Sequence, residues 1–247
     1  VHALYGFVRV PDEWVDNGGD VSPARMRRRM RDYRAQLLRG LDGVRPEHAV
    51  LRAFVDTMRE CRMPLEEPLL FLDAMEADFT VDRYATYDDL LGYIRGSATA
   101  VGLMMCHVIG AEPEPDVVEA ATALAEAMQM TNFLRDVGED WRERGRVYMP
   151  QDELAAFGLT DEDIARGEVT EAWREFMRFQ IARTRALYDK ADLGIPLLPR
   201  PTRRAVKLAR ILYCRILARI EERDYDSFSG RARTSRREKL AVLARVA

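Results

Sequence analysis

The sequence predicts an all-α protein with a single domain. Apolar residues recur at helical spacing along almost the whole chain, and the alternating β-branched runs that are typical of strands are absent. The chain has 247 residues, of which 47% are hydrophobic, and this is enough to bury one large core. Proline, glycine and capping residues divide the helical pattern into segments. Together these observations favour a bundle of helices.

The first half of the chain predicts a series of long helices. We expect them over 1–17, 23–40, 46–60, 66–78 and 86–109. Pro11 is expected to kink the first helix, which the glycines at 18 and 19 end. Thr86 is a candidate N-cap for the last. That last helix holds small residues, which let a neighbouring backbone or ligand come close: Gly92, Gly96, Ser97, Ala98, Ala100 and Gly102.

The second half continues the helical pattern. We expect long helices over 116–143, 170–191 and 202–223, and shorter turns over 151–157 and after Thr160. Thr160 and Thr170 are candidate N-caps. The proline-rich segment 194–201 reads as a rigid connection, and a basic tail follows the last long helix.

The composition excludes several classes of function. The chain carries 38 basic and 41 acidic residues, a net charge of −3, which gives no support for general binding of nucleic acids. The three histidines lack zinc-ligand spacing, and no apolar run reaches the roughly 18–20 residues of a membrane span. The three cysteines form no CxxC pair, so we expect reduced, buried thiols of a cytoplasmic protein: Cys61, Cys106 and Cys214.

Two pairs of carboxylates share the spacing Asp-x-x-x-Asp. They are Asp12 with Asp16, and Asp136 with Asp140. Residues four apart lie on one helix face, so each pair aims two carboxylates at one place. Like charges at this spacing destabilise a helix by roughly 0.2–0.5 kcal/mol. The pairs therefore indicate a site for a hard cation.

Each pair belongs to a longer polar stripe on its helix. The first stripe is Tyr5, Arg9, Asp12 and Asp16, and the second is Gln129, Asn132, Asp136 and Asp140, with Arg135 beside it. Mg²⁺ prefers oxygen ligands and is commonly held by one or two carboxylates plus substrate phosphates. The fork of an arginine suits phosphate oxygens. The combination predicts a Mg²⁺–diphosphate site between two helices.

Simpler interpretations stay open at this point. Solvated helix faces produce Asp-x-x-x-Asp pairs freely, and Arg9 and Arg135 can serve only to neutralise neighbouring carboxylates. A third acidic cluster does not share one face well, and we interpret it as the surface of a helix end: Asp73, Glu76 and Asp78.

The second pair lies in a run that resembles a known family. MTNFLRDVGED over 130–140, continued by RGRVYMP over 144–150, is similar to the squalene/phytoene synthase family of head-to-head prenyl transferases, and within it to the phytoene synthases. ALYGFVR over 3–9 with DEWVD over 12–16 resembles the family's first aspartate motif, and YIRGSA over 93–98 with Val101 and Gly102 its central small-residue helix. The resemblance covers essentially the whole chain and implies an isoprenoid-synthase-like bundle around a central cavity.

The resemblance also implies roles for individual residues. The metal ligands would be Asp12, Asp16, Asn132, Asp136 and Asp140. The four aspartates and Arg135 would form the catalytic set. The substrate contacts would be Tyr5, Arg9, Tyr93, Gln129, Arg135, Tyr148 and Tyr213. Tyr93 and Tyr213 are equally open to interpretation as packing residues.

Three features depart from the family pattern. Family members carry a further N-terminal segment with a helix that covers the active site, so we expect this chain to lack that segment. RGSATA over 95–100 replaces the more usual apolar-Ala-Gly-Thr run, which bears on substrate selectivity. Gly230 stands where the family often has an arginine, and Arg231 or Arg233 is the candidate substitute.

The activity that the resemblance implies is the joining of two geranylgeranyl diphosphates into phytoene through prephytoene diphosphate, in carotenoid biosynthesis. It implies Mg²⁺, with Mn²⁺ as a substitute, and no NADPH. One alternative is a relative that makes squalene, dehydrosqualene or presqualene diphosphate from C15 units. Another is a non-catalytic homologue that acts in assembly or interaction.

The basic face of the last long helix suggests a further partner. It carries Arg203, Arg204, Lys207, Arg210, Arg215 and Arg219. Such a face can touch an anionic membrane, where a lipid product must go, or can simply be solvated. The expected location is cytoplasmic, with peripheral membrane contact as an option.

Overall fold

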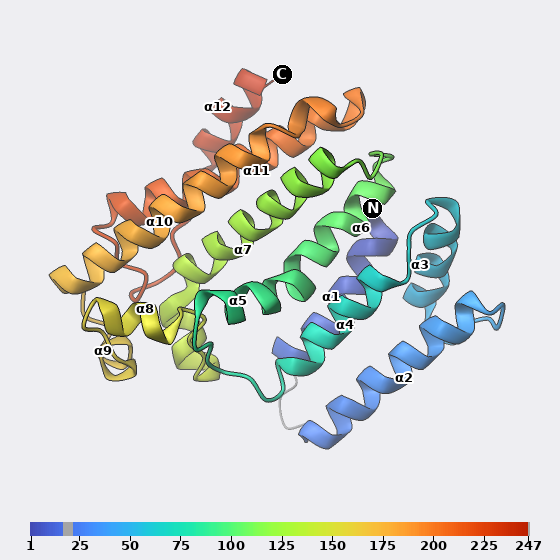
Figure 1. Cartoon of the computed structure of the whole chain (residues 1–247), viewed down its shortest axis with the longest axis horizontal. Coiled ribbons are helices and arrows are strands. Elements are labelled where there is room, and N and C mark those ends of the chain that lie inside the picture. The colour runs from blue at the N-terminus through green and yellow to red at the C-terminus, as the bar shows by residue number, and fades with distance from the viewer. Residues whose placement is uncertain (17–21, 247) are drawn as a thin grey trace. The chain divides into compact units, whose positions relative to one another are not determined.

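The computed structural model describes residues 1–16 and 22–246, apart from the side chains of Asp16, Pro23, Arg237, Ala241, Arg245 and Val246. Within these ranges every regular element is a helix, and the one β feature is an isolated bridge between Arg83 and Val147 (Figure 1). The all-α prediction is confirmed. The predicted end of the first helix at Gly18 and Gly19 falls outside the described residues.

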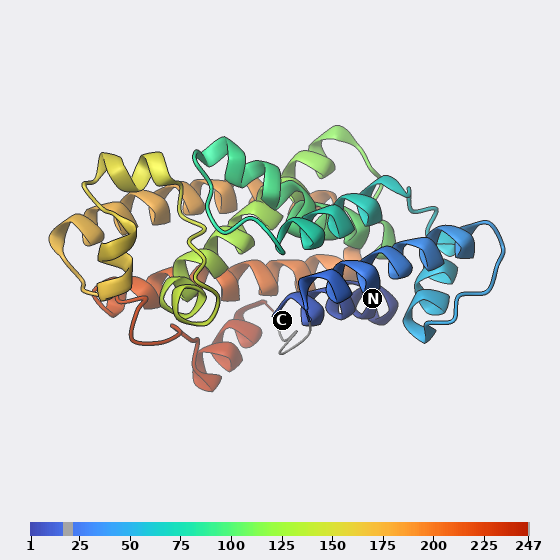
Figure 2. The same cartoon turned by 90° about the horizontal axis from the view of Figure 1, so that it is seen from below.

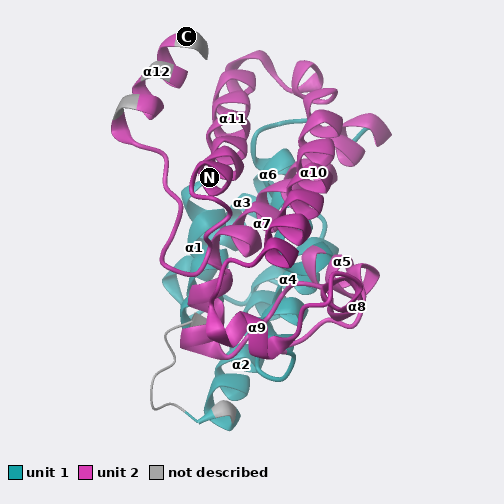
Figure 3. Cartoon of the chain, turned by 90° about the vertical axis from the view of Figure 1, so that its left-hand side faces the viewer, with its two compact units in different colours: residues 1–81, 95–114 teal, residues 82–94, 115–247 magenta. Residues whose placement is uncertain are grey.

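The chain divides into two compact units (Figure 3). Unit 1 comprises Val1–Val81 and Arg95–Glu114, and unit 2 comprises Asp82–Ile94 and Pro115–Ala247. Each motif of paired carboxylates therefore belongs to a different unit. The single domain expected over 1–247 stays a prediction.

Unit 1 is built around aromatic side chains from several helices. Its elements are α1 (His2–Asp16), α2 (Pro23–Leu41), α3 (Ala49–Glu60), α4 (Glu66–Ala77), the π-helix η1 (Arg95–Thr99) and α6 (Ala100–Val108). The Phe7 ring of α1 stacks on Phe54 of α3 at 3.9 Å between centroids, and contacts Tyr33 and Phe71. These buried rings fix the inner face of α1, so that the face with Tyr5 and Arg9 points outward.

The helix expected over 86–109 is three consecutive elements. It begins as α5 (Tyr87–Ile94), continues through the π turn η1 and ends as α6. Thr86 does cap it, because its hydroxyl accepts from the Asp89 amide at 3.2 Å while its own amide donates to the Asp89 carboxylate at 3.0 Å. The π turn is where Gly96 meets α4. A Cβ at Gly96 would lie 2.7 Å from the Leu70 carbonyl oxygen.

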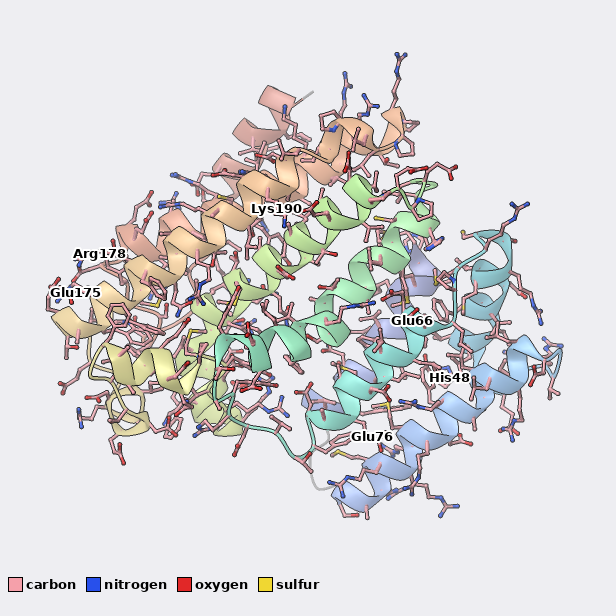
Figure 4. The ribbon with its side chains drawn as sticks, viewed as in Figure 1. His48, Glu66, Glu76, Glu175, Arg178 and Lys190 are labelled. Atoms are coloured by element: carbon pink, nitrogen blue, oxygen red, sulfur yellow. The ribbon has the colours of Figure 1, made fainter. Side chains whose placement is uncertain are left out.

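Unit 2 is organised around one long helix. Its elements are α5, α7 (Pro115–Arg144), α8 (Gln151–Ala156), α9 (Asp161–Arg166), α10 (Glu171–Asp192), the 3₁₀ turn η2 (Ile195–Leu197), α11 (Arg200–Glu222) and α12 (Arg236–Val246). Helices α7, α10 and α11 lie side by side in both views (Figures 1 and 2). Lys190 of α10, labelled in Figure 4, pairs with Glu119 of α7 at 2.8 Å.

Part of the basic tail expected after the last long helix forms a helix that the sequence reading did not include, α12. The Ser235 amide donates to the Glu238 carboxylate at 2.8 Å, and the Glu238 amide donates to the Ser235 hydroxyl at 3.3 Å. This is a capping box, which starts a helix by satisfying its first amides. Glu238 also pairs with Arg215 and Arg219 of α11. The segment is therefore a capped helix, and Glu238 pairs it with α11.

Two smaller expectations also need correction. The cysteines are free, but each is half-buried instead of buried. The acidic cluster is surface only in part. Asp73 is exposed and pairs with Arg34, whereas Asp78 at the C-cap of α4 is buried.

Candidate functional site

The second carboxylate pair lies on the buried side of α7. The helix is continuous from 115 to 144, so Gln129, Asn132, Asp136 and Asp140 share one face as predicted. The side-chain amide nitrogen of Asn132 donates to the side-chain oxygen of Gln129 at 3.3 Å. Asp136 and Asp140 are only 7% and 9% exposed. This excludes the solvated-face interpretation for the second pair.

Arginines from two segments surround Asp136. Arg135 donates from Nε and Nη2 to the two oxygens of Asp136 at 2.7 and 2.6 Å. Arg231, which follows α11, places Nε 3.0 Å from Asp136 Oδ1 and Nη2 2.7 Å from Glu139. Of the two arginines suggested for the C-terminal position, Arg231 is therefore the one that reaches the motif. Charge-assisted bonds of this kind are among the stronger ones in proteins.

Asp140 lies in a more strained electrostatic environment. Burial, together with the nearby charges of Asp136 and Glu139, raises the pKa of the Asp140 carboxyl from 3.8 to about 7. Arg144, which donates to Asp140 Oδ1 at 3.1 Å, and Arg146 act in the opposite direction. Burial is thus the main reason why the Asp140 carboxyl holds its proton more firmly than a free aspartate does.

The donor set suits a hard divalent cation. Asn132, Asp136 and Asp140 offer oxygen atoms, which Mg²⁺ prefers, and a cation would offset the cost of their buried charge. Among the residues that the structure describes, no group of three or more His, Cys, Asp or Glu side chains forms a metal cage by itself.

Aromatic rings gather beside α7 in the same unit. Tyr148 stacks on Phe133 at 4.1 Å between centroids and lies 5.7 Å from Tyr93 and 6.0 Å from Tyr84. Arg146 donates to the Tyr148 hydroxyl at 3.1 Å. The structure thus brings the predicted Tyr93 and Tyr148 together. Tyr84 and Phe133 were missed, because one ring in an apolar pattern does not reveal which rings it will join.

Tyr213 lies on α11, half-buried, near the second motif. The pKa of Arg135 is raised, first by its hydrogen bond to Asp136 and also by Tyr213. The phenol is therefore within electrostatic reach of the Arg135 guanidinium. This position agrees with a polar role.

The first motif in unit 1 has a different environment. Tyr5 is 66% exposed on α1. Arg9 donates to Asp12 at 2.6 Å and also pairs with Glu13, which sequence reasoning had not singled out. The hydrogen bond to Asp12 raises the pKa of Arg9. Asp16 ends α1, and its side chain lies outside the described residues.

The ion pairs of both motifs agree with the interpretation that their arginines neutralise nearby carboxylates. Arg9 and Arg135 do neutralise neighbouring carboxylates in this structure. Sequence reasoning assigned no role to Arg144, which begins the run over 144–150. Its spacing of four residues from Asp140 already indicated that the two side chains could pair on one helix face.

Comparison with known proteins relates this chain to a family. The family model described as squalene/phytoene synthase matches residues 1–238. Phytoene synthase 1, chloroplastic, of Arabidopsis thaliana is 40% identical over 98% of this chain and 58% of its own length. Phytoene synthase 2, chloroplastic, of Solanum lycopersicum is 40% identical over 98% of this chain and 79% of its own length. The chain thus spans roughly six-tenths of the length of several of these relatives.

Solved structures show the same fold. A dehydrosqualene synthase crystallised with a ligand aligns over 99% of this chain and 83% of its own, with a TM-score of 0.89 and 27% identity. The squalene synthase HpnC from Alicyclobacillus acidocaldarius aligns over 91% of this chain and 82% of its own, with a TM-score of 0.82 and 28% identity. With the family model matching nearly its whole length, this chain belongs to the squalene/phytoene synthase family.

Proposed function

We propose that this chain is a Mg²⁺-dependent prenyl transferase of the 15-cis-phytoene synthase type. It joins two geranylgeranyl diphosphates head to head through prephytoene diphosphate and yields phytoene for carotenoid biosynthesis. The observation that carries the proposal is the buried pair Asp136 and Asp140 on α7, with Arg135 on the first carboxylate. The 40% identity to phytoene synthases over nearly the whole chain supports the choice of product.

The residues of α7 bind the diphosphate end of the substrate. Asn132, Asp136 and Asp140 hold Mg²⁺, or Mn²⁺ in its place, and in α1 Asp12 and Asp16 are assigned the same task. Bound there, the metal supplies positive charge that offsets the charge on departing diphosphate.

The other polar residues of the α7 stripe orient the diphosphate. Arg135 presents its guanidinium fork to phosphate oxygens, and Gln129 and Tyr213 donate hydrogen bonds. In α1 we assign Tyr5 and Arg9 to diphosphate as well. The exposure of Tyr5 leaves its hydroxyl accessible to a ligand.

The aromatic rings beside α7 serve the hydrocarbon end. Loss of diphosphate leaves an allylic cation that must be kept from water. Ring faces attract a cation by roughly 0.5–2 kcal/mol. Phe133 and Tyr93 each stack on Tyr148, and we assign this aromatic cluster to the cation. Since the reaction joins two chains and loses a proton with no net reduction, NADPH is not required.

A C15-using relative is the second candidate, because the TM-score of 0.89 is to a dehydrosqualene synthase. The test is incubation of the protein and Mg²⁺ with either geranylgeranyl or farnesyl diphosphate, followed by chromatography of the apolar product. We expect phytoene from the C20 substrate and little C30 product. A C30 hydrocarbon formed in preference would assign the alternative, and no product from either would favour a non-catalytic homologue.

For location we propose a cytoplasmic enzyme, with peripheral membrane contact as an option. Among the described residues no helix is both long and apolar enough to cross a membrane. The basic face of α11 is partly neutralised, since Arg210 pairs with Asp192 at 2.7 Å and Arg219 pairs with Glu238. Less positive charge is therefore available for anionic lipids than the sequence indicated.

A further inference from the structure

The segment 225–232, which we call the C-terminal strap, lies against α7 where the second motif begins. After α11 ends at Glu222, the chain turns through Asp224 and Tyr225, both with left-handed φ angles of 55° and 63°. The Trp173 indole nitrogen donates to the Tyr225 carbonyl at 3.0 Å. The strap therefore starts from a fixed point on α10.

Ser227 joins the strap to one turn of α7. Its hydroxyl donates to the Leu134 carbonyl at 2.6 Å, and its carbonyl accepts from the Gly138 amide at 3.2 Å. Leu134 and Gly138 are four apart, so these two groups belong to the same helical turn. Ser227 is only 3% exposed. One buried serine thus bonds to both ends of the turn that carries Arg135 and Asp136.

Gly138 permits this close approach. A Cβ at this position would lie 2.7 Å from Phe228 Cα and 2.8 Å from the Phe228 carbonyl oxygen, which is closer than real Cβ atoms come. The Phe228 ring packs on Trp173 at 4.6 Å, and Arg142 donates to the Phe228 carbonyl at 2.7 Å. The strap backbone is therefore held on the surface of α7 from several sides.

The end of the strap places Arg231 beside Asp136 and Glu139 of the second motif. Arg223 donates to the Gly230 carbonyl at 2.7 Å and fixes the residue before it. Arg231 then reaches Asp136 at 3.0 Å and Glu139 at 2.7 Å. Only three residues separate Ser227 from Arg231. A displacement of the backbone at Ser227 therefore also displaces Arg231.

We propose that Ser227 is a positioning residue for diphosphate binding, which it serves by fixing the Leu134–Gly138 turn and by setting the place of Arg231 beside Asp136. This role rests on the proposed function, because it concerns the same Mg²⁺–diphosphate site. Ser227 itself touches neither metal nor substrate. Its hydroxyl acts through Arg231 and through the helical turn that presents Asp136.

The test uses Ser227→Ala, which removes the hydroxyl and keeps the backbone contact to Gly138. Ser229→Ala is the matched control. The exposed Ser229 hydroxyl donates to Asp226 and accepts from Arg223, and its removal leaves the bond from Arg223 to the Gly230 carbonyl in place. Ser227→Thr restores a hydroxyl. Melting curves for all three establish that each is folded.

The first readout is the binding of inorganic pyrophosphate in the presence of Mg²⁺, measured by calorimetry. Loss of a supporting contact behind a metal site typically weakens binding about 10- to 100-fold, and we expect a change of this size for Ser227→Ala alone. Ser229→Ala should bind as the wild type does, and Ser227→Thr should recover most of the affinity. The apparent KM for the prenyl diphosphate should rise in parallel.

The second readout is amide hydrogen exchange over 134–142, which reports on the turn without reference to activity. We expect faster exchange in Ser227→Ala and unchanged exchange in Ser229→Ala. Wild-type affinity in Ser227→Ala would overturn the role of Ser227, whatever the exchange shows. No pyrophosphate binding by the wild type would instead contradict the proposed function, and this role of Ser227 with it.

Discussion

At the scale of single residues, Asp136 is held by two arginines from different segments. Arg135 precedes it in α7, and Arg231 comes from the strap after α11. Removing one partner of such a buried set leaves charge without compensation, which is costly. Arg135 is the partner with two parallel hydrogen bonds, so its geometry, and not its charge alone, determines how Asp136 is presented.

Arg135→Lys tests the importance of that geometry. A lysine keeps the charge but offers one ammonium group in place of the planar fork. We expect kcat/KM for the prenyl diphosphate to fall by about 10²-fold, comparable to the loss of one oriented electrostatic donor. Steady-state kinetics give the value. Arg34→Lys, whose partner Asp73 is exposed, is the control and should have near wild-type kinetics.

At the scale of elements, the π turn η1 shows how one contact redirects a helix. Gly96 touches the α4 backbone at Leu70, whereas Gly92, one turn earlier in α5, has nothing within 4 Å of an added Cβ. Arg95 at the start of the turn donates to both oxygens of the buried Glu67 at 2.7 Å each. The turn is thus fixed to α4 by a close backbone approach and by an ion pair.

Gly96→Ala and Gly92→Ala therefore have opposite expected effects on the free energy of unfolding. The first forces a methyl group against the Leu70 carbonyl and should destabilise the protein by about 1–3 kcal/mol. The second replaces glycine in an uncrowded helix and should stabilise it by about 0.4–1 kcal/mol. Chemical denaturation measures both. Equal effects of the two changes would contradict the close packing of η1 on α4.

The pairing of α12 with α11 should depend on pH through Glu238. Hydrogen bonds from Arg219, Ser235 and Arg215 hold the pKa of Glu238 well below its usual 4.5. Because the folded pKa is the lower one, this contribution is present above pH 4.5 and is lost as the pH falls further. Amide protection in α12 should therefore drop between pH 6 and pH 3. Glu238→Gln should show the lower protection already at pH 6.

Local chemistry explains which elements could be predicted. Thr86, Thr160 and Thr170 cap helices because their hydroxyls lie at the right spacing, and the sequence shows that spacing directly. The capping box of α12, Ser235 to Glu238, was equally readable but was masked by the basic composition around it. The π turn was not predictable, because it depends on the approach of α4, which is distant in sequence.

At the scale of the whole molecule, the two carboxylate motifs differ in their surroundings. The motif on α7 is buried and bound by residues from the strap, whereas Arg9, Asp12 and Tyr5 lie on a more exposed face of α1. The sequence indicated the spacing of both motifs equally well. It did not show that Ser227 and Arg231, about ninety residues after α7's motif, would reach it, since such contacts depend on how the chain folds back.

The most direct test of the account is the conversion of geranylgeranyl diphosphate by the wild type and by Asp136→Asn in the presence of Mg²⁺. The wild type should form phytoene. Asp136→Asn should lose at least about 10²-fold in turnover while keeping the helical circular dichroism spectrum. Asp73→Asn, an exposed aspartate that pairs with Arg34, should match the wild type. Undiminished phytoene formation by folded Asp136→Asn would contradict the assignment of α7 as the Mg²⁺–diphosphate site.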